Sequence, residues 1–351
     1  MKIGILTLPF HTNYGGILQA YALQTVLEQL GHQAELMQRG LTPGMLPWHK
    51  DNTLEEILLM QQHTDSFIRQ YIHGHKTSIA DTHEGDYEAI VVGSDQIWRY
   101  LMVTHMMGAY EDAFLSFANG WDLRRISYAP SFGLDTWEAP ETMIPVISNL
   151  LRQFHAVSVR EQSGADICRQ LLGVEARHVL DPTLLLQPAD YDRLIQAADT
   201  HTPEGNLMCY VLDETPEKLR LIQAVARRYN LQPFRAHSRV EQADAPLHER
   251  IQPRPEQWLR SIRDAAMVVT DSFHAVAFSI LYGKPFIATG NPMRGLARLQ
   301  SLLSTFHAED HLVVSPAQLN PHASYAVDPT AADILNDARH HSLQFLNDAL
   351  K

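Results

Sequence analysis

Four short segments of the chain combine side chains that can move protons, bind anions and contact hydroxyl groups. They are Asn13-Tyr14-Gly15-Gly16, Gly93-Ser94-Asp95-Gln96-Ile97-Trp98, Arg160-Glu161 and Asp271-Ser272-Phe273-His274. An imidazole takes up and releases protons near neutral pH, and a carboxylate can accept a hydroxyl group or remove its proton. An arginine fork binds two oxygens of a carboxylate or phosphate. These segments are therefore the first candidates for a reactive site.

Each segment follows an apolar stretch that predicts a buried strand, and most precede apolar residues at helical spacing. The predicted strands are residues 3–8, 33–37, 89–92, 125–129, 156–159, 207–212, 267–270 and 285–288. The predicted helices are residues 17–30, 54–72, 141–153, 162–172, 216–229, 255–264, 274–282, 294–306 and 330–350. Strands that alternate with helices predict parallel sheets, whose ligands bind beyond the carboxyl ends of the strands. The four segments should therefore gather at that edge.

The length of 351 residues suggests two domains. We predict an α/β fold of two Rossmann-like parallel-sheet domains that face each other across a cleft. The first would cover residues 1–185 and the second residues 186–351, with a terminal helix that could pack back on the first domain. The turn at Gly15 and Gly16 lacks the three-glycine spacing of the dinucleotide fingerprint, which argues against a nicotinamide cofactor.

Composition narrows the class of protein further. The net charge of −12 at pH 7 argues against nucleic-acid binding, which depends on neutralising phosphates. Two cysteines cannot build a disulfide scaffold or a zinc cluster. The sequence shows neither the pattern of a signal peptide nor an apolar run long enough to span a membrane. We therefore expect a cytoplasmic protein without an integral membrane segment, a metal or a cofactor; peripheral membrane contact and oligomeric state stay open.

Five motifs stand in the same order as in a known family and extend over most of the chain. They are Asn13-Tyr14-Gly15-Gly16-Ile17-Leu18-Gln19-Ala20-Tyr21-Ala22-Leu23-Gln24, Val92-Gly93-Ser94-Asp95-Gln96-Ile97-Trp98, Ser158-Val159-Arg160-Glu161, Asp181-Pro182-Thr183 and Thr270-Asp271-Ser272-Phe273-His274. In these residues the chain resembles the polysaccharide pyruvyl transferase family. The resemblance implies a GT-B-like fold and transfer of pyruvate from phosphoenolpyruvate to a sugar hydroxyl pair of a surface polysaccharide or its lipid-linked precursor. The products would be a pyruvate ketal and free phosphate.

The last motif departs from the pattern Asp-Arg-Leu-His-Gly that many family members carry. Here it reads Asp271-Ser272-Phe273-His274-Ala275, so the histidine is kept and the arginine and glycine are not. A Ser-Phe-His version also occurs in the family. The departure leaves open which cation holds the donor, whose charge is roughly −2.5 to −3 near neutral pH.

The resemblance and the chemistry of the side chains together predict three groups of site residues. The predicted catalytic residues are His274, Asp95 and Asp271. The predicted donor-binding residues are Arg160, Arg294, Arg298 and Ser272. The predicted acceptor-binding residues are Asn13, Tyr14, Gly15, Gly16, Gln96 and Trp98. The acceptor is thus expected on the first half of the chain and the donor on the second.

Within the catalytic group, His274 would act as the base at the start of a helix. Asp95 would accept a hydrogen bond from a sugar hydroxyl or remove its proton. Trp98, from the acceptor-binding group, would stack on a sugar face. Asp271 would orient His274 or cap the helix that follows.

Two other functions fit the same architecture. A GT-B glycosyltransferase that uses a nucleotide sugar would differ in its donor alone. A sugar-binding protein without catalysis would use the same polar loops and form no product. The identity of the donor distinguishes a glycosyltransferase from a pyruvyl transferase. Product formation distinguishes either enzyme from a sugar-binding protein.

Overall fold

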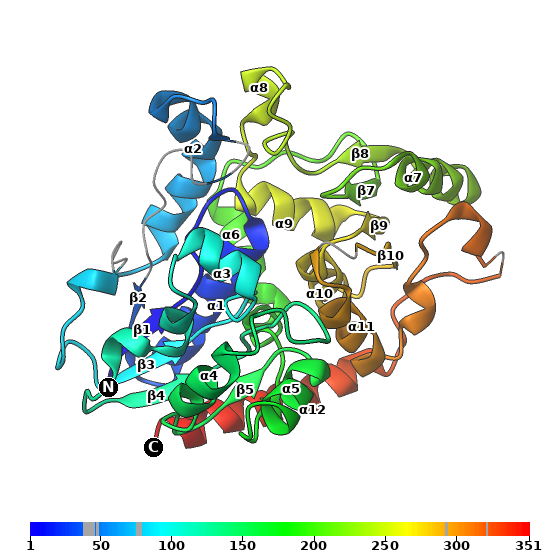
Figure 1. Cartoon of the computed structure of the whole chain (residues 1–351). Coiled ribbons are helices and arrows are strands. Elements are labelled where there is room, and N and C mark those ends of the chain that lie inside the picture. The colour runs from blue at the N-terminus through cyan, green and yellow to red at the C-terminus, as the bar shows by residue number, and fades with distance from the viewer. Residues whose placement is uncertain (38–45, 47–48, 75–78, 292–293, 321) are drawn as a thin grey trace.

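Two four-stranded parallel sheets with the same strand order form the two sides of the molecule (Figure 1). The computed structural model describes residues 1–37, 46, 49–74, 79–291, 294–320 and 322–351. The first sheet has the order β2 (Gln33–Met37), β1 (Lys2–Leu6), β3 (Ala89–Val92) and β4 (Arg124–Ser127). The second has the order β8 (Pro233–Arg235), β7 (Leu207–Tyr210), β9 (Met267–Thr270) and β10 (Phe286–Ala288). This is the predicted pair of Rossmann-like parallel sheets.

A third, two-stranded parallel pair continues the first sheet beyond β4. It consists of β5 (Ser158–Val159) and β6 (Arg177–His178). Ile126 in β4 bridges to Ala156, and the Ser127 amide donates to the carbonyl of Ala156 at 3.1 Å. The end of β5 therefore lies at the same sheet edge as the end of β3, which places Arg160 near Asp95.

Helices cover both faces of each sheet, so β1, β3 and β9 are almost continuously buried, as expected for central parallel strands. In the first half the α-helices are α1 (Tyr14–Gln29), α2 (Leu54–Tyr71), α3 (Tyr100–Met106), α4 (Met143–Leu151) and α5 (Gln162–Gln170). In the second half they are α6 (Pro188–Ala197), α7 (Pro216–Tyr229), α8 (Leu247–Arg250), α9 (Pro255–Asp264), α10 (Phe273–Leu281), α11 (Leu296–Thr305) and α12 (Ala331–Ala349). None of the described helices is both long and apolar enough to cross a bilayer.

Short 3-10 helices join several of these elements. They are η2 (Ile79–Asp81), η3 (Tyr110–Phe114), η4 (Ser116–Ala118), η5 (Pro182–Leu184), η7 (Glu309–His311) and η8 (Pro316–Gln318). The turn η5 matters most for the site, because the side chain of Asp181 caps it by accepting from the Thr183 amide at 3.0 Å. This fixes Asp181 where the chain passes from the first half to the second.

The two halves share one hydrophobic core, which α1, α9 and α10 help to build between the sheets. Tyr14 at the start of α1 packs against Trp258 of α9 and Tyr210 of β7, with ring centroids 5.4 and 6.1 Å apart. Its hydroxyl donates to the carbonyl of Pro253 at 2.8 Å. The start of α1 is therefore held by residues of the second half.

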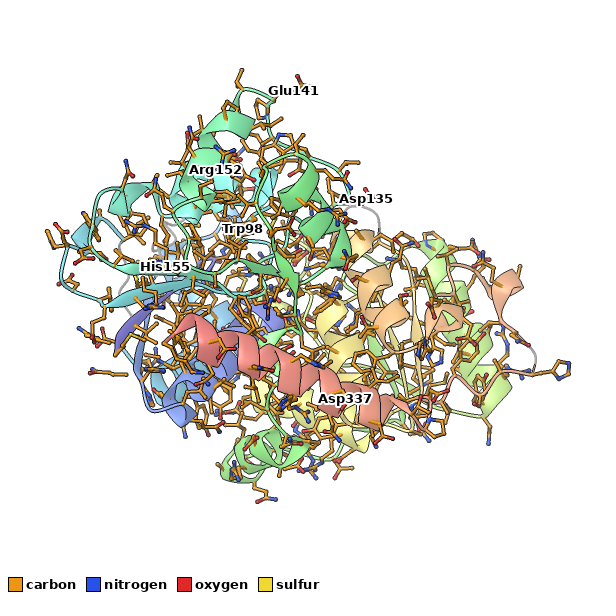
Figure 2. All side chains as sticks on the ribbon, turned by 90° about the horizontal axis from the view of Figure 1, so that it is seen from below. Trp98, Asp135, Glu141, Arg152, His155 and Asp337 are labelled. Carbon is orange, nitrogen blue, oxygen red and sulfur yellow. The ribbon has the colours of Figure 1, made fainter. Side chains whose placement is uncertain are left out.

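The helix α12 crosses back and packs on the first half, lying along the underside of the molecule in Figure 2. Arg339 donates to the carbonyls of Leu184 and Leu186, and Ser342 accepts from the Leu180 amide at 3.0 Å. Arg124 of β4 donates to the carbonyl of Ala349 at 3.1 Å. Residues from the far end of the sequence thus brace the segment that carries Asp181.

The strands and helices predicted from the sequence are all present within the described residues, and their ends agree or differ by at most three residues. The prediction omitted the elements β6, β8, α3, α6 and α8. Two or three residues carry no hydrophobic period, which explains β6 and β8. For α6 a signal existed, since Pro188 occupies its first turn and Gln187 and Asp190 form a capping box. The domain boundary at residue 185 stays a prediction.

Candidate active site

A cavity of about 370 Å³ lies between the carboxyl ends of the two sheets. The loops that follow β1, β3, β7, β8 and β9 all contribute to its lining. This is the place where open α/β sheets bind ligands. Residues from both halves line the cavity, among them Asp95 and Gln96 from the first and His274 and Arg298 from the second.

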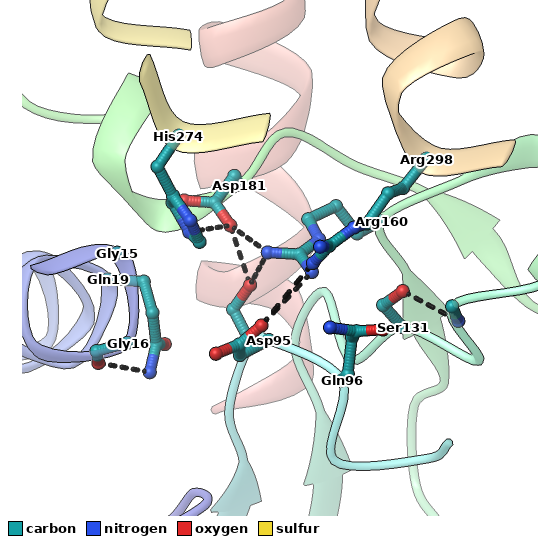
Figure 3. Close-up of polar contacts among 12 residues, drawn as sticks. Gly15, Gly16, Gln19, Asp95, Gln96, Ser131, Arg160, Asp181, His274 and Arg298 are labelled. Carbon is teal, nitrogen blue, oxygen red and sulfur yellow. Dashed lines mark hydrogen bonds and ion pairs between the residues drawn. The ribbon is translucent and has the colours of Figure 1, made fainter. Parts of the chain in front are cut away.

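At one end of the cavity, His274 faces a chain of buried charged groups (Figure 3). Its Nε2 lies 3.6 Å from Oδ2 of Asp181. The same oxygen accepts from Nη1 of Arg160 at 2.8 Å and from the Ser94 hydroxyl at 2.7 Å. The other oxygen of Asp181 accepts from the Thr183 amide and hydroxyl at 3.0 and 2.7 Å. Asp181 therefore accepts four hydrogen bonds, from Arg160, Ser94 and Thr183, in addition to its contact with the imidazole.

Asp181 is ionised at neutral pH although it is buried. Burial alone would raise its pKa, but His274 and Arg160 outweigh burial and hold the pKa well below its usual range. An ionised carboxylate this close to Nε2 stabilises the imidazolium that forms when the ring takes up a proton. The pair can therefore serve as an acid–base unit.

Gly15 and Gly16 at the start of α1 leave room for the two candidate catalytic side chains. A Cβ atom on Gly15 would lie 2.0 Å from Nδ1 of His274. A Cβ atom on Gly16 would lie 3.4 Å from Oδ2 of Asp95. Gly15 was predicted to contact the acceptor, but it packs directly on the imidazole; Gly16 and the helix cap Asn13 do line the cavity.

We expect the substitution Gly15→Ala to lower turnover by about 10²-fold, because it must push the imidazole away from its position and such misplacement is costly. Turnover and thermal melting of the purified variant test this. Gly16→Ala is the matched comparison: its new Cβ would approach Asn13 Nδ2 to 3.3 Å, a contact that a small shift relieves. Equal activities for both variants would contradict the assigned role of Gly15.

Asp95 occupies a strained backbone conformation at the end of β3. Its φ of 75° lies in the left-handed region, which costs a residue with a Cβ about 1–2 kcal/mol. The Ser131 amide donates to its carbonyl at 2.8 Å and holds the turn. Its Oδ1 lies 3.5 Å from both Arg160 Nη2 and Arg298 Nη1. Burial would raise the pKa of Asp95, but Arg160, His274 and Arg298 together outweigh burial and lower it. Asp95 is therefore a carboxylate.

Arg298 lines the cavity, and Asp95 at 3.5 Å is the carboxylate with which it pairs among the described residues. Its Nη2 donates to the carbonyl of Arg294 at 2.7 Å, and its guanidinium lies 5.8 Å from the Phe273 ring. Its Nε has no hydrogen-bond partner among the described residues. Burial and the nearby Arg160 lower its pKa to about 10, so it stays charged at neutral pH. Such a group favours an anion beside it.

The prediction that Arg160 contacts the donor is wrong, because Arg160 does not belong to the cavity lining. Its side chain is only 1% exposed and lies behind Asp95, bound to Asp181 and stacked 4.4 Å from the Phe273 ring centroid. Arg294 does line the cavity, but Asp213 binds it through Nε and Nη2 at 2.7 and 2.9 Å. Arg298 is therefore the predicted arginine that lines the cavity with the weaker ion pairing: one carboxylate at 3.5 Å, against two carboxylates for Arg294.

Asp271 is not the partner of His274, because Asp181 takes that place. Its oxygens accept from the amides of Leu212 and Asp213 at 2.7 and 3.2 Å, from Lys218 Nζ at 2.8 Å and from Asn291 Nδ2 at 3.0 Å. Asp271 therefore ties together the loops after β7, β9 and β10. Ser272 takes the cap position of α10 and lines the cavity, but its side chain makes no capping hydrogen bond.

Tyr14 and Trp98 cannot contact an acceptor, since both side chains are completely buried outside the cavity. Trp98 lies deep among packed side chains in Figure 2, stacked on Phe114 with ring centroids 5.0 Å apart. Its Nε1 donates to the carbonyl of Ala113 at 3.0 Å. A buried aromatic residue whose polar atom already has a partner is part of the core. Gln96 does line the cavity and accepts from Arg99 Nη1 at 3.0 Å.

Sequence reasoning missed Asp181 and the loop after β8. The Asp181-Pro182-Thr183 motif carried part of the family resemblance, and the order Asp-Pro after an apolar stretch was the available signal. The loop after β8 brings His237 and Glu241 to the cavity, and its short strand gave no pattern. Burial lowers the pKa of His237 to about 3 and that of His11, also in the lining, to about 4, so both are neutral at pH 7.

The family model for polysaccharide pyruvyl transferase matches residues 13–292, which include His274, Asp95 and Asp181. The chain belongs to this family. Membership supports a transferase of polysaccharide biosynthesis. No curated protein matches the chain.

Solved structures with the same overall fold are GT-B enzymes. UGT89C1 of Arabidopsis thaliana complexed with UDP is 10% identical, with 99% of this chain and 98% of that chain covered and a TM-score of 0.53. UDP-GlcNAc 2-epimerase from Neisseria meningitidis bound to UDP-GlcNAc is 9% identical, with coverages of 100% and 99% and a TM-score of 0.50. At these identities the likeness confirms the predicted GT-B fold alone.

Proposed function

We propose that this polysaccharide pyruvyl transferase family member transfers pyruvate from phosphoenolpyruvate to a pair of sugar hydroxyls, forming a ketal and releasing phosphate. The observation that carries the proposal is the placement of His274, backed by the ionised Asp181, in the same cavity as the incompletely compensated Arg298. An acid–base group next to an anion-binding group is what the reaction requires.

In the proposed reaction, the imidazole of His274 takes the proton of the first sugar hydroxyl as its oxygen attacks the central carbon of the enol. The methylene carbon gains a proton, which the imidazolium can supply. The bond from the central carbon to the phosphate oxygen then breaks, and the second hydroxyl closes the ring and gives up its proton. One phosphoenolpyruvate and one diol thus give one ketal and one phosphate.

The other groups of this corner support the same steps. Arg298 and the amides at the start of α10 would hold the phosphate and carboxylate, since helix N-termini favour anions. The carboxylate of Asp95 would accept a sugar hydroxyl or its proton. A chain of net charge −12 repels the donor at long range, so this local cation must outweigh that repulsion.

Thermal melting with candidate donors tests the proposal. A donor at a hundredfold excess over its Kd adds about 2.7 kcal/mol of stability. We expect phosphoenolpyruvate to raise the melting temperature and UDP-glucose to leave it unchanged, and Arg298→Gln to abolish the shift. Phosphate release with sugar acceptors then reports turnover. Stabilisation by UDP-glucose alone would identify a nucleotide-sugar glycosyltransferase instead, and binding without product under every donor would identify a sugar-binding protein.

A further inference from the structure

The cavity has two walls of different chemistry. One is the corner formed by His274, Asp95 and Arg298. The other part of the lining, here called the second-sheet wall, is formed by the loops after β7 and β8 with Arg294. The charged residues and the histidine of this wall are Asp213, Glu214, Arg235, His237, Arg239 and Glu241, together with Arg294.

Every arginine of the second-sheet wall is already bound to a carboxylate. Arg294 binds Asp213 and also contacts Glu241 through Nη2. Arg235 pairs with Glu214. Arg239 pairs with Glu249, which lies outside the lining, at 2.8 Å. This wall therefore lacks the uncompensated cation that a phosphate ester needs.

The charge states of the titratable groups also argue against a phosphate ester at this wall. Hydrogen bonds from Arg294, against some burial, lower the pKa of Asp213, so this carboxylate is charged. His237 is neutral because burial depresses its pKa to about 3. The wall thus presents charged carboxylates and a neutral ring. A second phosphate-bearing ligand would face the carboxylates of Asp213, Glu214 and Glu241.

We propose that the second-sheet wall binds the sugar ring of the acceptor as a neutral polyol, while phosphoenolpyruvate occupies the corner at Arg298. The inference rests on the proposed function. It keeps the donor at Arg298 and moves the acceptor from the first half of the chain, where it was expected from the sequence, to the second. Asp213 and Glu241 are the residues that select the acceptor. Their side chains are 43% and 30% exposed, so each carboxylate can accept a sugar hydroxyl while still bound to Arg294.

Saturation-transfer NMR on the full chain tests this with methyl glycopyranosides of glucose, galactose and mannose as probes. We expect at least one of them to receive saturation from the unaltered protein, and Asp213→Asn and Glu241→Gln to weaken its binding by about tenfold or more, as for loss of a hydrogen bond to a charged group. The melting shift with phosphoenolpyruvate should stay unchanged in both variants. Arg298→Gln should do the reverse.

Glu204→Gln is the matched control, because Glu204 is an exposed glutamate of the same half outside the cavity. Melting curves without ligand check that each variant is folded. The proposal is overturned if none of the three glycosides contacts the unaltered protein, if the two wall variants keep their sugar binding, or if they lose the shift with phosphoenolpyruvate instead. UDP binding that depends on Asp213 or Glu241 would also overturn it. Failure of the proposed function would be seen separately, as the lack of a phosphoenolpyruvate shift in the unaltered protein.

Discussion

Replacing His274 with alanine should lower turnover by about 10²–10⁴-fold while leaving the protein folded, since general acid–base groups contribute rate factors of that size. The imidazole of His274 lines the cavity and faces the ionised carboxylate of Asp181. Without it, the sugar hydroxyl would have to lose its proton to water or to Asp95. The measurement is phosphate release from phosphoenolpyruvate in the presence of acceptor.

The fold should survive this substitution because Asp181 keeps its other partners. Arg160, Ser94 and Thr183 still donate to it in His274→Ala, so no unpaired buried charge is created. His340→Ala serves as the control, because His340 lies on the exposed face of α12. A folded His274→Ala enzyme that releases phosphate at the rate of the His340→Ala control would remove the imidazole from the mechanism.

The second large effect concerns stability. Arg160→Leu should lower the free energy of unfolding by about 3–5 kcal/mol, because it leaves buried carboxylates without their partner cation. Asp181 and Asp95 are the two carboxylates concerned, and both are almost completely buried. Urea unfolding at neutral pH measures the loss. Arg169→Leu is the control: Arg169 pairs with Asp166 on the surface of α5, where such pairs contribute about 0–1 kcal/mol.

The loss should also depend on pH. The pKa values of Asp181 and Asp95 are lowered in the folded protein from an ordinary value of 3.8. A carboxyl group with a depressed pKa contributes stability above its unfolded pKa and loses that contribution as the pH falls. The gap between the unaltered protein and Arg160→Leu should therefore be full at neutral pH and narrow below about pH 4. A gap that widens on acidification would contradict the role of Arg160 as their counter-charge.

The alternation of apolar and helical stretches was enough to predict the two parallel sheets and the edge at which the site lies. Local sequence patterns were sufficient, because a buried parallel strand appears as a short apolar run and the helix that follows it as apolar residues at helical spacing. The motif around His274 also pointed to a residue that lines the cavity. What the sequence could not supply was the partner of that histidine, since Asp181 precedes it by more than ninety residues and meets it only through η5 and α10.

The same limit explains the errors at Arg160, Tyr14 and Trp98. A residue that directly follows a strand can point into the cavity or back into the packed interior, and its type alone does not decide which. Arg160 turns inward because Asp181 and Asp95 neutralise it there. Tyr14 turns inward because Trp258 and Tyr210 of the other half provide an aromatic surface. These partners come from distant parts of the chain, so only the folded arrangement reveals them.

The return of α12 to the first half has a mechanical consequence. The backbone leaves the first half after Leu186 and re-enters it along α12, and Arg339 clamps the two passages together through the carbonyls of Leu184 and Leu186. Because α1, α9 and α10 also share one core between the sheets, any relative movement of the two halves would have to disturb that packing as well as bend both passages.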